Sequence, residues 1–224
     1  MTYTNIHIMS FEDAAVYSRL VDIPPTIIIS IEDRGWILTP LDIDNPAILG
    51  AIKIYINDTE EPTAKYAMTE HDAGRIVAFV KAHLSMHPEI LVHCAGGISR
   101  SAGIAAALGR WLNSNDEFVL SSPYRRPNFL CYIRVLDAAG ISYDYEYEKH
   151  RFNEQHEFSH KWNENDHLDI DKKTLSEIKP YEHELCLTQS EIDDMKRGWQ
   201  DIEERLRHRS WKNASAESAM QWIL

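Results

Sequence analysis

The chain has 224 residues, 44% hydrophobic and 26% charged, which is enough for one domain with a buried core and unlike a disordered or fibrous chain. Its 35 acidic and 23 basic residues give a formal charge of -12, which disfavours nonspecific binding to nucleic acid or to an anionic membrane. No apolar run approaches the roughly 20 residues that span a bilayer, no signal peptide is recognisable, and three widely spaced cysteines make no disulfide framework. We therefore expect a cytoplasmic protein with free thiols that binds neither nucleic acid nor membrane.

Short β-branched runs predict strands, and the segments between them have helical periodicity and helix-capping residues. In chain order, the expected elements are a strand at 4–9, a helix from 11 to about 20, strands at 26–31 and 51–56, a helix from 69 to about 83, a strand at 89–93, and helices at 102–112 and 126–139. This alternation predicts an α/β fold with a central, largely parallel sheet of four to five strands flanked by helices.

The composition becomes more polar near residue 148, which predicts a first domain at 1–148 and a C-terminal extension at 149–224. The run Thr188–Glu191 fits a capping box, and apolar residues at helical spacing continue from it to about residue 209. A short helix at 219–223 is also expected. The extension is therefore predicted to be mostly helical, and its role is open between a lid, a dimerisation element and a substrate-recruiting element.

The segment Ile90–Ser101 combines a strand, a cysteine, a loop with two glycines, an arginine and the start of a helix. Consecutive N–H groups of a tight loop form an anion-binding nest, and the N-terminus of the following helix also attracts an anion. Arg100 adds a planar guanidinium that fits two oxygens of a phosphate, while Gly96 and Gly97 let the backbone turn tightly. In this field we expect the pKa of Cys94 to fall from about 8.5 toward roughly 3.5–7.5, which would make it a nucleophilic thiolate beside a bound phosphate.

A cysteine at the end of a strand can also be a small buried hydrophobe, and we interpret Cys131 and Cys186 in this way. Neither has a glycine loop or a cation beside it in the sequence. Around Cys94, by contrast, the strand, the glycines, the five-residue gap to Arg100 and the helix all agree. Cys94 is therefore the predicted nucleophile.

The run His93-Cys94-x5-Arg100-Ser101 resembles the signature of the cysteine-dependent protein tyrosine phosphatase superfamily, and Gly97–Ala102 most resembles its dual-specificity branch. The resemblance covers about residues 1–148. It implies a phosphocysteine intermediate on Cys94, and it implies that phosphate is bound by Arg100 and by the N–H groups of the loop residues Ala95, Gly96, Gly97, Ile98 and Ser99. It further implies that Ser101 donates a hydrogen bond to the thiolate and that His93 positions the loop and tunes the thiol. An ordinary core histidine and a helix N-terminal hydroxyl are the alternative interpretations of His93 and Ser101.

The family takes its general acid from an aspartate on a loop after an earlier strand, and Asn57-Asp58-Thr59 resembles that loop. Asp58 is therefore the expected acid, with a solvated turn residue as the alternative and Glu60 and Glu61 as further candidates. Pro127-Asn128 resembles the start of a late helix in dual-specificity phosphatases, where Asn128 would brace the phosphate loop. A plain helix start with proline at its first position is the alternative.

Arg125 and Arg126 either steer an anionic substrate toward the site or are simply solvated. His83 and His87 lie four residues apart but lack a His-Glu-x-x-His pattern between them, and no metal is expected. No cofactor is expected either.

Together these features predict a protein phosphatase acting on phosphotyrosine, with phosphoserine and phosphothreonine left open. Its expected partner is a phosphorylated protein or peptide, and its oligomeric state is open. The absence of lysine in residues 95–99 disfavours a phosphoinositide phosphatase, and the acidic charge disfavours an RNA triphosphatase. Two other classes stay open: a pseudophosphatase that binds phosphoproteins without turnover, and a rhodanese-like sulfurtransferase, which needs no general acid.

Overall fold

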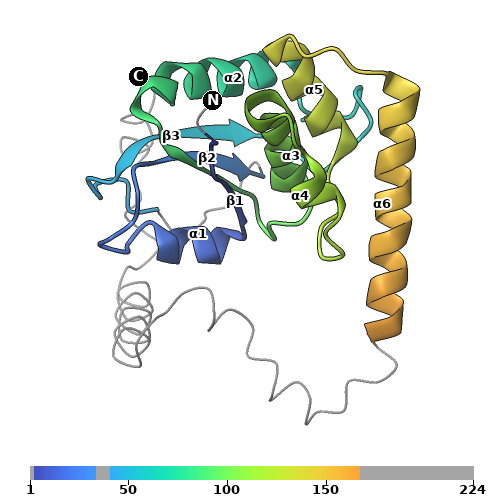
Figure 1. The fold of residues 1–224 in the computed structure, drawn as a ribbon, viewed down its shortest axis with the longest axis horizontal. Helices are drawn as coiled ribbons and strands as arrows, with labels where there is room; N and C mark the ends of the chain where they lie inside the picture. The colour runs from blue at the N-terminus through green and yellow to red at the C-terminus, as the bar shows by residue number, and fades with distance from the viewer. Residues whose placement is uncertain (1–2, 34–40, 167–224) are drawn as a thin grey trace, which may run out of the picture. The chain divides into compact units, whose positions relative to one another are not determined.

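The computed structural model describes residues 3–33 and 41–166, which lie within one compact unit, Met1–Asp169. Its four strands are β1 (Ile6–Met9), β2 (Thr26–Glu32), β3 (Ile48–Tyr55) and β4 (Glu89–His93). They form one sheet in the order β1-β4-β2-β3, and every neighbouring pair is parallel (Figure 1). The predicted fold class, a parallel sheet flanked by helices, is confirmed.

Helices lie between the strands and after the last of them. They are α1 (Phe11–Tyr17), α2 (Glu70–His83), the short 3-10 helix η1 (Leu84–Met86), α3 (Arg100–Asn113), α4 (Glu117–Leu120), α5 (Phe129–Ala139) and α6 (Tyr145–Asp166). Ser10 caps α1, and Thr69 caps α2 in a capping box with Asp72. Helix α5 starts at Phe129, two residues after Pro127, because the Asn128 side chain accepts a hydrogen bond from the Cys131 N–H and caps the helix.

Every residue of β2 is buried, and successive side chains point to opposite faces of the sheet. Ile27, Ile29 and Ile31 belong to the large core formed with α2, α3 and α5, whereas Ile28 packs with Ala14 of α1 on the opposite face. Figure 1 shows α1 on one side of the sheet and α2, α3 and α5 on the other. Because all four strands are parallel, the loops that follow them meet at one edge of the sheet, where open α/β sheets bind their ligands.

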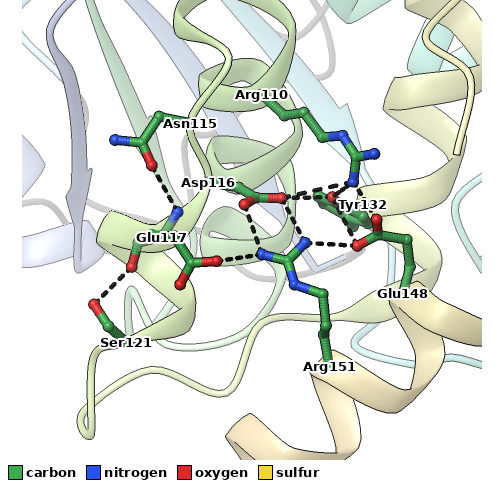
Figure 2. A network of polar contacts seen from close by, with 8 residues as sticks. All are labelled: Arg110, Asn115, Asp116, Glu117, Ser121, Tyr132, Glu148 and Arg151. Carbon is green, nitrogen blue, oxygen red and sulfur yellow. Dashed lines mark hydrogen bonds and ion pairs between the residues drawn. The ribbon is translucent and has the colours of Figure 1, made fainter.

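Helix α6 begins at residue 145 and therefore crosses residue 148, where the composition changes. A network of polar contacts attaches it to the domain (Figure 2). The Arg151 guanidinium lies 2.8 Å from Asp116 Oδ1 and 2.8 Å from Glu148 Oε2, and Arg110 also binds Glu148. The Tyr132 hydroxyl of α5 donates to Asp116 at 2.6 Å, so the network joins α3, α4, α5 and α6.

The ends of the other predicted elements agree with the structure to within a few residues, or the predicted elements lie outside the described residues. Helix α1 ends at Tyr17, three residues before its expected end, and β3 starts at Ile48, three residues before its expected start. The helices predicted after residue 188 lie outside the described residues. Within the described residues, no helix has both the length and the apolar character needed to cross a bilayer.

Candidate active site

The loop that joins β4 to α3 runs from Cys94 to Ser99, and Arg100 is the first residue of α3. We name this loop the phosphate loop after the role that the family resemblance implies for it. Cys94 is buried, with 3% of its surface exposed. Its Sγ lies 3.1 Å from the hydroxyl of Ser101, one residue into the helix. The candidate nucleophile therefore sits at the base of a loop that ends in a helix N-terminus, where the orphan N–H groups favour a negative charge.

The carbonyl groups of this loop are held by the surrounding protein. The carbonyl of Ala95 accepts from the Phe11 N–H at 3.1 Å, and that of Gly97 accepts from a side-chain N–H of Arg125. The Ile98 carbonyl accepts from the Arg126 N–H at 3.0 Å, and the Ser99 carbonyl from the Asn128 N–H at 3.1 Å. Because the peptide unit is planar and trans, each N–H points opposite to the carbonyl of the residue before it. The N–H groups of residues 96, 98, 99 and 100 therefore point away from these partners, and they are the donors available to an anion.

Arg125 was expected either to steer an anionic substrate or to be solvated, and its contacts in the structure fit neither description. Its guanidinium donates to the carbonyl of Gly97 and, at 3.2 Å, to the carbonyl of Ile8. Arg125 thus ties the phosphate loop to β1, and Arg126 contributes through its backbone N–H. The sequence does not distinguish this role of Arg125 from exposure to solvent, since two arginines before a proline are also typical of a solvated turn.

Asp58 lies next to the phosphate loop, as the resemblance predicts. Its Oδ1 accepts a hydrogen bond from Ser99 Oγ at 2.7 Å and another from Asn128 Nδ2 at 3.0 Å. Asn128 Nδ2 also donates to the carbonyl of Thr59 at 3.2 Å. Asn128 therefore holds the Asp58 loop with its side chain and the phosphate loop with its backbone. The sequence suggested a role only for the backbone N–H of Ser99, whereas in the structure its side chain joins the two loops.

Glu60 and Glu61 have partners that favour their charged forms. Burial raises the pKa of Glu60, but the Phe129 N–H at 2.9 Å and the Lys149 ammonium at 3.0 Å outweigh burial, so the pKa lies below its usual value. Hydrogen bonds from the hydroxyl and the N–H of Thr63 lower the pKa of the exposed Glu61. A general acid needs the opposite shift, so these contacts disfavour both glutamates as the acid.

His93 is fully buried beneath the loop, where its ring lies 5.9 Å from that of Phe11. Burial lowers its pKa to about 4, although nearby Glu32 and the backbone of Cys94 partly offset this effect. His93 is therefore neutral at physiological pH. Any influence on Cys94 comes from packing and from the imidazole dipole, because the ring carries no positive charge there.

Arg100 contacts a residue that the sequence analysis did not single out. Its guanidinium donates to both carboxylate oxygens of Asp33, at 2.8 and 3.0 Å, and to the carbonyl of Ile56 at 2.8 Å. Asp33 directly follows β2, the strand beside β4. The usable signal was topological: an acidic residue at the carboxyl end of a neighbouring parallel strand lies at the same sheet edge as the phosphate loop.

Helix α6 contacts the Asp58 loop directly and is linked to the Cys94–Ser99 loop through Arg125. Lys149 forms the ion pair with Glu60 on the Asp58 loop. Gln155 Nε2 donates to the carbonyl of Ser122 at 2.9 Å and to the carbonyl of Arg125. Since Arg125 in turn binds Gly97, residues beyond 148 support the site through the segment that precedes α5.

Cys131 is also buried, and burial raises the pKa of its thiol well above its usual value, as expected of a core cysteine. Among residues 3–33 and 41–166, no group of three or more His, Cys, Asp or Glu side chains is arranged to hold a metal ion.

The chain is similar to several solved phosphatase structures. Human DUSP28 has 16% identity and a TM-score of 0.46, with 60% of this chain and 91% of that chain covered. A mouse protein assigned to the dual specificity phosphatases has 18% identity and a TM-score of 0.43, covering 58% of this chain and 79% of that one. The human tyrosine phosphatase-like serine/threonine/tyrosine-interacting protein has 20% identity and a TM-score of 0.37, covering 51% and 76%.

No protein-family model and no curated protein sequence matches the chain. The three solved structures are at most 20% identical to the chain, so the chemistry of the site is argued from its own contacts.

Proposed function

We propose that the chain is a protein phosphatase that hydrolyses phosphotyrosine, with phosphoserine and phosphothreonine as further substrates to be tested. The observation that carries the proposal is the 2.7 Å hydrogen bond between Ser99 and Asp58. It joins a loop bearing a nucleophile and anion-binding N–H groups to a carboxyl group that can protonate a leaving group. A rhodanese-like sulfurtransferase needs the first of these and not the second.

In the first step, the Cys94 thiolate attacks phosphorus, the S–P bond forms, and the P–O bond to the leaving group breaks. The inward N–H groups of the loop and the Arg100 guanidinium bind the phosphoryl oxygens and stabilise the charge that develops on them. Asp58 gives a proton to the departing oxygen. Among the described residues only its Oδ1 accepts hydrogen bonds, which leaves Oδ2 to carry that proton.

In the second step, a water oxygen attacks phosphorus, the S–P bond breaks, and the Asp58 carboxylate takes the proton of the water. The departing thiolate is stabilised by the hydroxyl of Ser101, 3.1 Å from Sγ. The products are inorganic phosphate and the free thiolate, and no cofactor takes part.

The first test is hydrolysis of para-nitrophenyl phosphate by the freshly reduced full chain in the presence of a chelator. Cys94→Ser is expected to retain less than about a tenth of the rate, while Cys131→Ala controls for loss of a buried thiol elsewhere. Retention of most of the activity in Cys94→Ser would exclude Cys94 as the nucleophile. An inactive wild-type chain that still binds phosphopeptide would instead identify a pseudophosphatase, and turnover of thiosulfate would identify a sulfurtransferase.

The second test concerns the acid. Asp58→Asn is expected to lower the rate roughly 10²–10⁴-fold on an alkyl or phenyl phosphate with a poor leaving group, and much less on one with a good leaving group. Glu61→Gln is the matched control, because Glu61 is an exposed carboxyl group on the same loop. Equal losses on both substrates would rule out Asp58 as the acid.

A further inference from the structure

Asp33 forms the closest charged contact of Arg100. The carboxylate of Asp33 meets the guanidinium end-on, with Oδ1 2.8 Å from Nη1 and Oδ2 3.0 Å from Nη2. The arginine side chain is 6% exposed and the aspartate side chain 29%. This bidentate geometry fixes the plane of the guanidinium as well as its charge.

The hydrogen-bond donors of Arg100 divide into two sets. A guanidinium carries five N–H groups, and three of those of Arg100 donate to Asp33 and to the carbonyl of Ile56. The two that remain are on Nε and on the adjacent side of Nη2, and they lie on one edge of the group. Nε of Arg100 is buried and has no hydrogen-bond partner among the described residues. A phosphoryl group with two oxygens matches that edge.

The ion pair therefore does not consume the edge that a phosphate needs. Were Asp33 to sequester Arg100 from substrate, the carboxylate would occupy the edge that contains Nε; instead it occupies the opposite end. A free arginine side chain has several rotatable bonds whose freedom opposes a single orientation. Asp33 and the Ile56 carbonyl remove that freedom before substrate arrives.

We propose that Asp33 is a positioning residue for phosphoryl transfer, which holds Arg100 so that its Nε and Nη2 donors face the phosphoryl oxygens. The inference rests on the proposed function, because it assigns Arg100 to the phosphoryl group. Asp33 is not an alternative general acid, since both of its oxygens accept hydrogen bonds from Arg100. It acts through Arg100 and does not touch the substrate.

The test compares Asp33→Asn with Glu70→Gln in the full chain. The asparagine side chain would keep the size of the aspartate and lose the charge and one acceptor, so we expect kcat/KM for para-nitrophenyl phosphate to fall about 10- to 100-fold. Inhibition by inorganic phosphate is expected to weaken in parallel. Glu70→Gln removes a carboxylate 2.7 Å from Arg134, an exposed ion pair away from the loop, and should change neither quantity. An unchanged or raised kcat/KM in Asp33→Asn would overturn the inference.

A double-mutant cycle separates positioning from general support of the fold. A lysine ammonium cannot form the end-on bidentate contact with Asp33. In an Arg100→Lys background, Asp33→Asn should therefore lower kcat/KM by less than about threefold. If the two losses multiply independently, Asp33 does not act through Arg100, and the inference fails. Both variants are compared at equal folded fractions, measured by thermal unfolding.

Phosphate binding is measured separately from turnover, as the protection of Cys94 from iodoacetate by inorganic phosphate. Weaker protection in Asp33→Asn supports the inference even if the wild-type chain hydrolyses nothing, in which case only the proposed function fails. Protection that is equal in the wild type and in Asp33→Asn, or absent from both, overturns the inference.

Discussion

Gly97 is the position of the phosphate loop at which an added methyl group meets the most resistance. Its φ is +69°, in the left-handed region, where a residue with a Cβ atom costs about 1–2 kcal/mol more than glycine. A Cβ at Gly97 would also lie 2.7 Å from the carbonyl carbon of Met9 and 2.8 Å from the Ser10 nitrogen. These are backbone atoms that cannot rotate away, so the loop or the start of α1 must shift, at a cost of roughly 1–3 kcal/mol.

Gly96 provides a matched control one residue away. A Cβ there meets nothing closer than the flexible end of Ile98, at 3.6 Å, and its φ is not in the left-handed region. Both alanine variants lose the same entropy in the unfolded chain, so that contribution, about 0.4–1 kcal/mol, cancels between them. Gly97→Ala should therefore be about 2–5 kcal/mol less stable than Gly96→Ala.

The assay is urea unfolding of the two variants followed by far-UV circular dichroism, with the midpoint and slope reported for each. Gly97→Ala should also lose most of its hydrolysis of para-nitrophenyl phosphate, because the N–H group of Ile98 moves with the loop. A stability difference below about 1 kcal/mol between the variants would refute the described contact between the loop and the start of α1.

Three further predictions use groups around the site. Ser101→Ala should slow hydrolysis of the phosphocysteine about 10- to 100-fold, seen as a burst of nitrophenol before a slow steady state, because a hydrogen bond to a charged group is worth about 1.5–3 kcal/mol; a steady-state rate equal to wild type would exclude this role. Arg151→Ala should lower the free energy of unfolding by roughly 3–5 kcal/mol, since Asp116 stays buried without its bidentate partner; a loss below about 1 kcal/mol would mean that water replaces the pair. Glu60 has a folded-state pKa below its unfolded value of about 4.5, so its stabilising contribution is complete above that pH and is lost as the pH falls through the folded-state pKa. The unfolding free energies of wild type and Glu60→Gln should converge on acidification, and a gap that widens would contradict this sign.

The local arrangement of the candidate site was predictable because its central residues are contiguous in the chain. The cysteine, the glycines and the arginine occur within Cys94–Ser101, and the end of one strand and the start of one helix fix their arrangement. The position of Asp58 required a family resemblance as well, because a turn aspartate has no periodic signal of its own. Asp33 pairs with Arg100 across 67 positions, so the sequence could indicate it only through its place at the end of a strand and not through a local motif.

Helix α6 shows why an apolar pattern is an incomplete guide to what is buried. Over residues 145–161, its buried residues are Glu148, Phe152, Gln155 and Ser159. They follow one another at spacings typical of a single helical face, yet only one of the four is hydrophobic. The change to a more polar composition therefore places a boundary at 148, although the helix continues across it.

The polar residues on that face are tolerated because each has a partner supplied by the domain. Glu148 binds Arg110 and Arg151, Gln155 binds backbone carbonyls of the segment before α5, and Ser159 donates to the carbonyl of Pro123 at 2.9 Å. Such contacts are directional, so they fix the position of the segment before α5 more narrowly than apolar packing would. Because Arg125 in that segment holds the carbonyl of Gly97, the orientation of the loop N–H groups depends on a helix that the composition assigns to the extension.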